Sequence, residues 1–368
     1  MNTSEYPAWL RLVSIKGLGP GIIQKLLTKY SSPKNIFKAA RDELEELTFI
    51  PKKVIENIIH FDSREFVETQ LKLLDKHKVC LVSIIDDEYP HLLKYIYNPP
   101  ILLYMQGKLI PEDEPAFAVV GTRKPTQYGK IAVRKIVPKL AQSGFSIISG
   151  LAYGIDSASH HEALNAGGRT IAVFGTSLDI VYPSANRKLA ERILSDGALI
   201  SEIPLGEKIE AWNFANRNRI ISGMSKGTLV VEGARTSGAL LTAKYALEQN
   251  RDIYAIPGNI NSPMSEGPNY LIKLGAKIVC KPEDILEEYK VKLQLGEEKR
   301  AKDIQPKIKL DETEEKLFKL LIDNNKNLSL DKMVELTDES PAKLSSILLQ
   351  MELKGLVKRE AQNRYWLI

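Results

Sequence analysis

The sequence predicts an α/β protein with a doubly wound, extended Rossmann-like parallel sheet, an N-terminal helical domain and a C-terminal winged-helix domain. Two patterns lead to this prediction. Between residues 117 and 279, short apolar segments alternate with helical stretches, which is typical of a parallel sheet covered by helices on both faces. After residue 309, three helical stretches precede two strand-like segments, which is the order of elements in a winged helix.

Residues 1–76 are expected to form the helical domain. They contain the segment SIKGLGPGIIQKLL, in which Gly17 and Gly19 permit a tight turn between two helices. Backbone N–H groups at the start of the second helix can then face a phosphate. The segment resembles a helix-hairpin-helix or SAM-like domain, and a plain corner between two helices is an equal alternative.

The central domain is expected to span residues 77–289. Its regular strands are predicted at FAVV, FSIIS, TIAVFG, ALISE, TLVVEG, DIYAIPG and AKIV. Residues 290–308 are polar and charged, and we interpret them as a linker. The winged-helix domain then covers residues 309–368, in which Ser340 and Pro341 form a favourable helix start.

The composition indicates a globular protein of the cytoplasm. Of its 368 residues, 43% are hydrophobic and 26% are charged, which suffices for a sizeable core. The two cysteines, Cys80 and Cys280, form neither a disulfide framework nor a zinc pattern, and we find no secretion signal or membrane span. The net charge is +5, and residues 117–289 hold most of it, with 20 Lys and Arg against 16 Asp and Glu.

Glycine, hydroxyl and arginine residues follow the predicted strands, at the edge where a doubly wound sheet binds its ligands. Such loops bring backbone N–H groups and guanidinium groups close to phosphate. One nucleotide needs one such loop, so several loops in a row suit a polymer of phosphates whose bases stack on aromatic side chains. The candidate residues for this ligand are Gly121, Thr122, Arg123, Gly150, Tyr153, Gly175, Thr176, Ser177, Leu178, Tyr182, Phe214, Arg217, Asn218 and Arg219.

Several of these residues also have a purely structural interpretation. Glycines after strands are common in any α/β protein. Arg217 and Arg219 could pair internally with Glu202 and Glu232, which we expect to end neighbouring strands. Asp156 is expected to be the N-cap of a helix that begins at Ser157, and its alternative role is to orient a loop that touches the ligand.

The sequence favours a binding protein over an enzyme or a metalloprotein. Neither the GxGxxG nor the GxxxxGK[ST] pattern of nucleotide-binding proteins is present. His160 and His161 would point about 100° apart on a helix, and they have no third ligand at a suitable spacing. Ser149, Ser177 and Ser237 stand in no nucleophile elbow. We therefore expect no catalytic residue, no metal and no cofactor.

Taken in order, the loop segments resemble the DNA-processing protein A (DprA/Smf) family. The matching segments are VVGTRKPTQYG, IISGLAYGIDSASHHEAL, GGRTIAVFGTSLDIVYP, LISEIPLG, FANRNRIISGMS, LVVEGARTSGALLTAKYALEQNRDIYAIPG and EGPNYLIKLGA. The resemblance implies a single-stranded-DNA-binding protein of natural transformation, which protects incoming strands and loads the RecA recombinase past single-strand-binding protein. It also implies a homodimer formed through the α/β domain and no catalytic activity.

The resemblance places the DNA pocket on four segments of this chain. They are Thr122 with Arg123, Gly175 to Leu178, the Tyr182-Pro183 turn, and Arg217 with Arg219. The chain departs from the family pattern at Tyr153, Ser159, Ser177, Ser184 and Ala215. Tyr153 and Ser184 stand where relatives carry basic residues. We therefore expect these positions to contribute less to the salt dependence of DNA binding, and stacking of a base on Tyr153 to offset the lost charge.

The alternative function is that of a nucleoside-monophosphate phosphoribohydrolase of the lysine-decarboxylase-like type, whose fold is similar. Those enzymes need the loop pattern PGGxGTxxE. The comparable loop here, VVEGARTSGALLTA, lacks the double glycine and the downstream glutamate. This alternative would be favoured if the protein released a base from a nucleotide and if a Glu232→Ala variant did not. For the winged helix, the sequence leaves duplex DNA and a protein open as partners.

Overall fold

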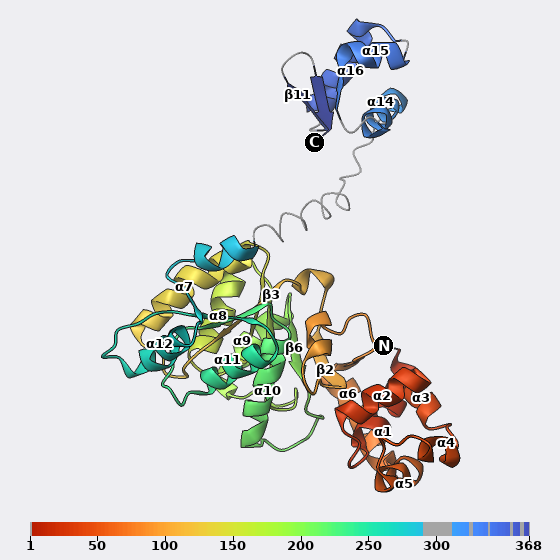
Figure 1. Cartoon of the computed structure of the whole chain (residues 1–368), viewed down its shortest axis with the longest axis vertical. Helices are drawn as coiled ribbons and strands as arrows, with labels where there is room; N and C mark the ends of the chain where they lie inside the picture. Colours follow the sequence, from red (N-terminus) through yellow and green to blue (C-terminus); the bar gives the residue numbers. More distant parts are fainter. Residues whose placement is uncertain are drawn as a thin grey trace. The chain divides into compact units, whose positions relative to one another are not determined.

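The computed structural model describes residues 2–289, 311–323, 327–337, 339–353, 356–360 and 364–367. It divides into two compact units, Met1–Tyr289 and Lys290–Ile368 (Figure 1). Each unit has its own apolar core. The linker predicted at residues 290–308 lies outside the described residues. No helix in the described ranges is both long and apolar enough to cross a membrane.

The first unit begins with a block of helices around an apolar core. Its helices are α1 (Tyr6–Ser14), α2 (Pro20–Tyr30), α3 (Pro33–Ile36), α4 (Arg41–Glu45), α5 (Lys52–His60) and α6 (Arg64–His77), after the 3-10 turn η1 (Thr3–Glu5). The turn between α1 and α2 depends on Gly17, whose φ of 83° suits glycine, and Pro20 is the first residue of α2. Trp9, Leu10 and Ile23 are buried in the core of this block.

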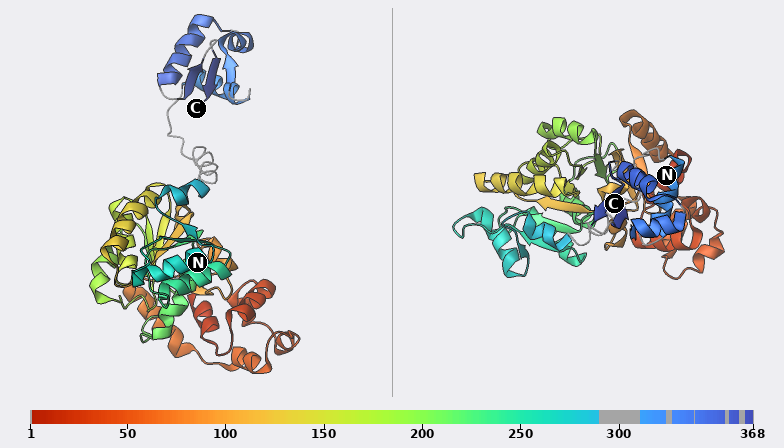
Figure 2. Two further views of the ribbon diagram at one scale, coloured as in Figure 1. Left: turned by 60° about the vertical axis from the view of Figure 1, so that its left-hand side comes forward. Right: turned by 90° about the horizontal axis from the view of Figure 1, so that it is seen from above.

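A nine-stranded sheet forms the centre of the first unit (Figures 1 and 2). Its strands are β1 (Cys80–Ser83), β2 (Leu102–Gly107), β3 (Ala116–Val120), β4 (Ser146–Ser149), β5 (Thr170–Val173), β6 (Ala198–Ser201), β7 (Gly227–Val230), β8 (Asp252–Ala255) and β9 (Lys277–Ile278). The order across the sheet is β1-β2-β6-β5-β4-β3-β7-β8-β9. Strands β3 to β9 pair in parallel, and β1 and β2 form an antiparallel addition at the β6 edge. The predicted doubly wound parallel sheet is confirmed.

Helices separate the parallel strands. They are α7 (Gln127–Gln142), α8 (Ile155–Asn165), α9 (Arg187–Leu194), α10 (Ala211–Gly223), α11 (Gly238–Glu248) and α12 (Glu266–Lys273), with the short turns η2 (His91–Tyr95), η3 (Pro111–Asp113), η4 (Ser184–Asn186) and η5 (Pro263–Ser265). The chain runs outward from β3 to β6 and returns beside β3 as β7. The order of the strands therefore reverses between β3 and β7, which is where doubly wound sheets bind ligands.

This strand order contradicts one expectation. Glu202 follows β6 and Glu232 follows β7, but β5, β4 and β3 lie between those two strands. The expectation that both acids end neighbouring strands is therefore wrong. The expectation assumed that strands consecutive in the chain are neighbours in the sheet. In a doubly wound sheet, β6 and β7 instead lie on opposite sides of β3, β4 and β5.

The helical block and the sheet are joined by buried hydrogen bonds. The Gln70 side chain on α6 donates to the Leu205 carbonyl at 2.9 Å and accepts from the Leu205 N–H at 3.1 Å. The Tyr6 hydroxyl accepts from the Leu81 N–H at 3.0 Å. The boundary predicted after residue 76 thus falls in the last turn of α6, inside one compact unit.

The second unit has the predicted winged-helix order. Its elements are α14 (Glu312–Asp323), β10 (Asn327–Ser329), α15 (Leu330–Thr337), α16 (Pro341–Leu353), β11 (Val357–Glu360) and β12 (Arg364–Leu367). The three strands pair antiparallel in the order β10-β12-β11. Ser340 accepts at its side chain from the Lys343 N–H, so it caps α16 as expected.

Candidate nucleic-acid interface

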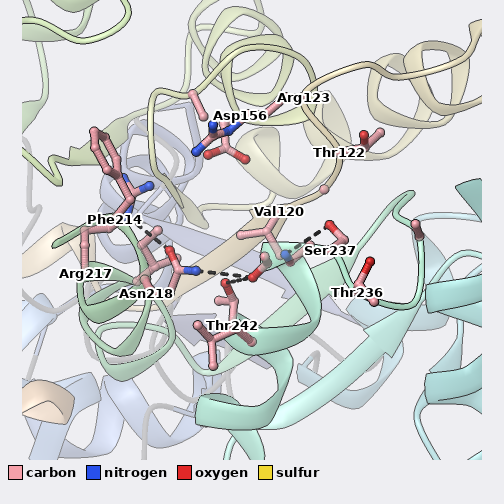
Figure 3. A pocket seen from close by; sticks show the side chains of 18 of the residues that line it. Val120, Thr122, Arg123, Asp156, Phe214, Arg217, Asn218, Thr236, Ser237 and Thr242 are labelled. Atoms are coloured by element: carbon pink, nitrogen blue, oxygen red, sulfur yellow. Dashed lines mark hydrogen bonds between the residues drawn. The ribbon is translucent and has the colours of Figure 1, made fainter. Parts of the chain in front are cut away.

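A cavity of about 560 Å³ opens at the carboxyl edge of the sheet, at the point where the strand order reverses. We call it the switch-point cavity. Figure 3 shows side chains from four segments around it. These segments are the β3–α7 loop, the start of α8, the first three turns of α10, and the loop that leads into α11 together with the start of that helix. The lining residues include Thr122, Arg123, Lys124, Asp156, Phe214, Arg217, Asn218, Thr236 and Ser237.

Arg123 and Lys124 supply the exposed positive charge of this cavity. Both side chains are exposed, and neither has an ion-pair partner among the described residues. Thr122 orders the backbone beneath them, because its hydroxyl accepts from the Lys124 N–H at 3.2 Å. The loop therefore presents two free cations and a hydroxyl at the rim, which are groups that bind phosphate.

Glu232 fixes both ends of this loop. Its backbone carbonyl accepts from the Thr122 N–H at 2.7 Å. Its carboxylate accepts from the Thr126 N–H at 2.8 Å and from the Thr126 hydroxyl at 2.5 Å, just before α7 begins. The side chain is only 2% exposed. The carboxylate therefore holds the β3–α7 loop in place, and both of its oxygens accept hydrogen bonds from that loop.

The β4–α8 loop packs directly on the β3–α7 loop. Gly154 has a φ of 83°, and a Cβ atom there would collide with the Thr122 carbonyl oxygen and the Arg123 backbone. The Ile155 N–H donates to the same Thr122 carbonyl at 3.2 Å. This contact holds Tyr153, whose side chain is 50% exposed, close to the Arg123 loop.

Arg217 supports the cavity from behind. Its guanidinium is buried and donates to the carbonyls of Gly150, at 2.7 Å, and of Val173. A Cβ atom on Gly150 would collide with that guanidinium, so any larger residue there would displace the Arg217 side chain. Burial lowers the pKa of Arg217 to about 10, and the nearby Asp156 carboxylate opposes this shift. Arg217 is therefore still cationic at neutral pH, below the surface of the cavity.

The prediction that Asp156 caps its helix is wrong. Helix α8 begins at Ile155 and its N-cap is Gly154, because the left-handed turn at Gly154 starts the helix two residues earlier than predicted. Burial raises the pKa of Asp156, and Arg217 together with the N–H groups of Ala152 and Gly150 opposes this shift. Asp156 thus orients the β4–α8 loop, and the contact of this loop with the ligand stays a prediction.

Arg219 makes the internal ion pair that the sequence left open. Its side chain is 6% exposed and lies 2.6 Å from the Glu202 carboxylate. Although it follows Arg217 by two residues, it does not line the switch-point cavity. Asn218 between them does line the cavity, and its amide donates to the Gly238 carbonyl at 3.2 Å.

The Gly175 to Leu178 loop approaches the cavity through one aromatic ring. A Cβ atom on Gly175 would lie 2.7 Å from the Phe214 ring, and the Phe214 ring lies 5.3 Å from that of Tyr182. The side chains of Thr176, Ser177 and Leu178 are buried. Phe214 therefore forms part of the cavity wall, and the half-exposed Tyr182 extends the aromatic surface beside it.

The structure also adds residues that our site prediction omitted. Lys124, Thr236 and Ser237 line the cavity, the last two from the segment GARTSG. This segment leads into α11, and a glycine-rich helix start is the sequence signal that could have found these residues. The side chain of His160 is buried, with Nδ1 2.7 Å from the Thr170 hydroxyl, and no cluster of three potential metal ligands occurs in the described ranges.

Comparisons with known proteins identify the family. A model described as DNA recombination-mediator protein A matches residues 80–290, a SAM-like helix-hairpin-helix tandem matches 10–61, and a DprA winged helix domain matches 301–363. The protein Smf of Synechocystis is 35% identical over 398 aligned positions, which cover 99% of both chains. This chain belongs to the DprA/Smf family. The resemblance drawn from the loop segments is thereby confirmed.

Solved structures agree with this membership. DprA of Streptococcus pneumoniae superimposes with a TM-score of 0.67 at 34% identity, over 78% of this chain and 99% of that one. DprA of Helicobacter pylori superimposes with a TM-score of 0.52 at 27% identity, over 57% of this chain and 95% of that one. The structure of the Helicobacter protein is described as showing a unique single-stranded DNA binding mode.

Proposed function

We propose that this DprA/Smf protein binds single-stranded DNA at the switch-point cavity and serves natural transformation. One observation carries the proposal: Arg123 and Lys124, which have no ion-pair partner in the part of the chain that the structure describes, line a cavity where the strand order reverses. The single-stranded DNA binding mode described for the Helicobacter relative supports this choice of ligand.

The cavity offers separate groups for phosphates and for bases. Arg123, Lys124 and the Thr122 hydroxyl suit phosphate oxygens, and the buried Arg217 adds positive potential. Phe214 and Tyr182 offer ring faces on which bases can stack. Binding would therefore depend on salt and tolerate many sequences.

The proposal extends to partners that family membership suggests. The protein would act as a cytoplasmic homodimer that protects incoming strands, displaces single-strand-binding protein and loads RecA. Sedimentation at rising protein concentration would test the dimer. Faster formation of RecA filaments on coated single strands would test the loading step, and an unchanged rate would contradict it.

Binding without catalysis is part of the same proposal. Both carboxylate oxygens of Glu232 accept hydrogen bonds from Thr126 and hold a loop in place. A phosphoribohydrolase would need such an acid to act on the ribose. We expect no release of free base when nucleoside monophosphates are incubated with the protein, and release that Glu232→Ala abolishes would contradict this.

The decisive measurement is the affinity for fluorescent oligo-dT at two salt concentrations. Arg123→Ala should weaken binding about tenfold and lower the slope of log K against log salt by about 0.7, because one phosphate contact is lost. Arg217 is unsuitable for this test because its removal would leave the Gly150 and Val173 carbonyls without their partner.

The matched control is Arg64→Ala, which removes a cation with an 85% exposed side chain from α6. It should leave the affinity unchanged within about twofold. If the wild type shows no preference for single strands over duplex, or if Arg123→Ala binds as tightly as the control, the cavity does not hold the DNA.

A further inference from the structure

A second hollow of about 860 Å³ lies between α7 and α8 and adjoins the switch-point cavity. We call it the α7–α8 groove. The β3–α7 loop and α7 line one side of it, and the β4–α8 loop and α8 line the other. Arg123 and Lys124 line both the groove and the switch-point cavity, so the two hollows meet at this pair of cations.

The groove is basic along its α7 side. Lys130 and Arg134 lie one turn apart on α7 and therefore project to the same side. With Arg123 and Lys124 they form a row of four cations, against a single acid in the groove, Glu162. Arg134 is 3.9 Å from Glu162 and stays 60% exposed, and Lys130, like the two rim cations, has no acidic partner among the described residues.

The α8 side of the groove suits bases. Ser157 and Ala158 are small residues that line the groove. Tyr153 also lines the groove with a half-exposed ring, and the contact of Gly154 with Thr122 and Arg123 holds the backbone beside Tyr153 against the Arg123 loop. A stacking surface thus lies opposite a row of phosphate-binding groups, which is the arrangement that single strands require.

We propose that the α7–α8 groove holds a second stretch of the same single strand, which leaves the switch-point cavity over Arg123 and Lys124. This inference rests on the proposed function and extends it. A short oligonucleotide would fill only the cavity, whereas a longer one would also contact Lys130 and Arg134. The groove would therefore set the length of strand that one protomer binds.

The test compares oligo-dT of about 5 and about 20 nucleotides, since single-strand sites span about 4–16 nucleotides. In the full-length protein, the variant Lys130→Ala/Arg134→Ala should weaken binding of the longer strand about tenfold. It should also lower the salt slope by about 1.4, at about 0.7 for each lost phosphate contact. Binding of the short strand should change by less than about twofold.

The matched control is Lys139→Ala, which removes an exposed cation from α7 outside the groove. It should leave both strands bound as in the wild type. If the double variant binds the longer strand as tightly as this control, while Arg123→Ala still weakens both strands, the groove inference fails and the cavity proposal stands.

Two further outcomes separate the two proposals. If the double variant binds the short and the longer oligo-dT with equally reduced affinity, the loss is a general effect of charge and the groove inference is overturned. If the wild type binds neither strand, the proposed function fails and the groove inference fails with it. A circular dichroism spectrum and a melting temperature equal to those of the wild type would show that the double variant is folded.

Discussion

His160 illustrates how a polar residue near the site serves the fold. Its Nδ1 lies 2.7 Å from the Thr170 hydroxyl, and that hydroxyl donates to the Ile147 carbonyl at 2.6 Å. Because the hydroxyl proton is used there, Nδ1 carries the imidazole proton and donates to Thr170. The neutral ring therefore joins α8 to β5, and burial lowers the pKa of His160 to about 3.

This pKa makes stability depend on pH. The unfolded chain protonates a histidine near pH 6.5, whereas folded His160 stays neutral down to about pH 3. Between these values the unfolded state binds more protons, so acid favours unfolding. We expect the contribution of His160 to be complete above pH 6.5 and to decline by about 1.4 kcal/mol per pH unit below it.

Urea unfolding at several pH values would measure this slope. His160→Gln should be less stable than the wild type at pH 7 and should lose most of the slope between pH 6 and 4. His161→Gln changes the exposed neighbour on α8 and should retain most of it. An unchanged slope in His160→Gln would show that other groups cause the acid sensitivity.

At the scale of elements, close contacts between backbones decide where the loops lie. The β3–α7 loop is held by Glu232 on one side and by Gly154 of the β4–α8 loop on the other. A similar device joins the helical block to the sheet, where Gln70 forms two hydrogen bonds with the Leu205 backbone. In both places a buried side chain, Glu232 or Gln70, forms hydrogen bonds with backbone groups of a loop. Those backbone groups have no partner in any described strand or helix.

Gln70→Ala should therefore weaken the first unit. Because Gln70 is 3% exposed, its removal leaves the Leu205 N–H and carbonyl without partners in a buried place. We expect a loss of about 2–3 kcal/mol in the free energy of unfolding. The exposed Gln142→Ala should cost less than about 0.5 kcal/mol, and equal values for the two variants in denaturant titrations would refute this role.

At the scale of the whole molecule, the two compact units have separate cores. The core of the second unit consists of its own residues, among them Leu321, Met333 and Leu348. In the first unit, Tyr289 at the C-terminal end packs its ring 5.4 Å from that of Phe145. Each unit thus has the buried apolar surface that independent folding requires.

A chain truncated after Tyr289 should therefore fold and bind DNA. We expect its melting temperature to match the main transition of the full-length protein within about 2 °C. Its affinity for oligo-dT should agree with the full-length value within about threefold, because the cavity and the groove lie in the first unit. A fall of about 10 °C would mean that the second unit stabilises the first.

The sequence alone determined the fold class and the family. Period, turn residues and helix starts are local properties, so the alternation from β3 to β9 and the cap at Ser340 were correctly predicted. The glycine-rich loops also follow strands as expected, because the carboxyl ends of parallel strands share one edge.

Only the tertiary structure decided which charged residue serves which purpose. Arg123, Arg217 and Arg219 look equally suited to phosphate in the sequence, yet only Arg123 is exposed, whereas Arg217 is buried against carbonyls and Arg219 pairs with Glu202. Lys130 and Arg134 line a groove only because α8 packs against α7. Exposure and pairing depend on elements distant in the chain, and local sequence patterns do not contain that information.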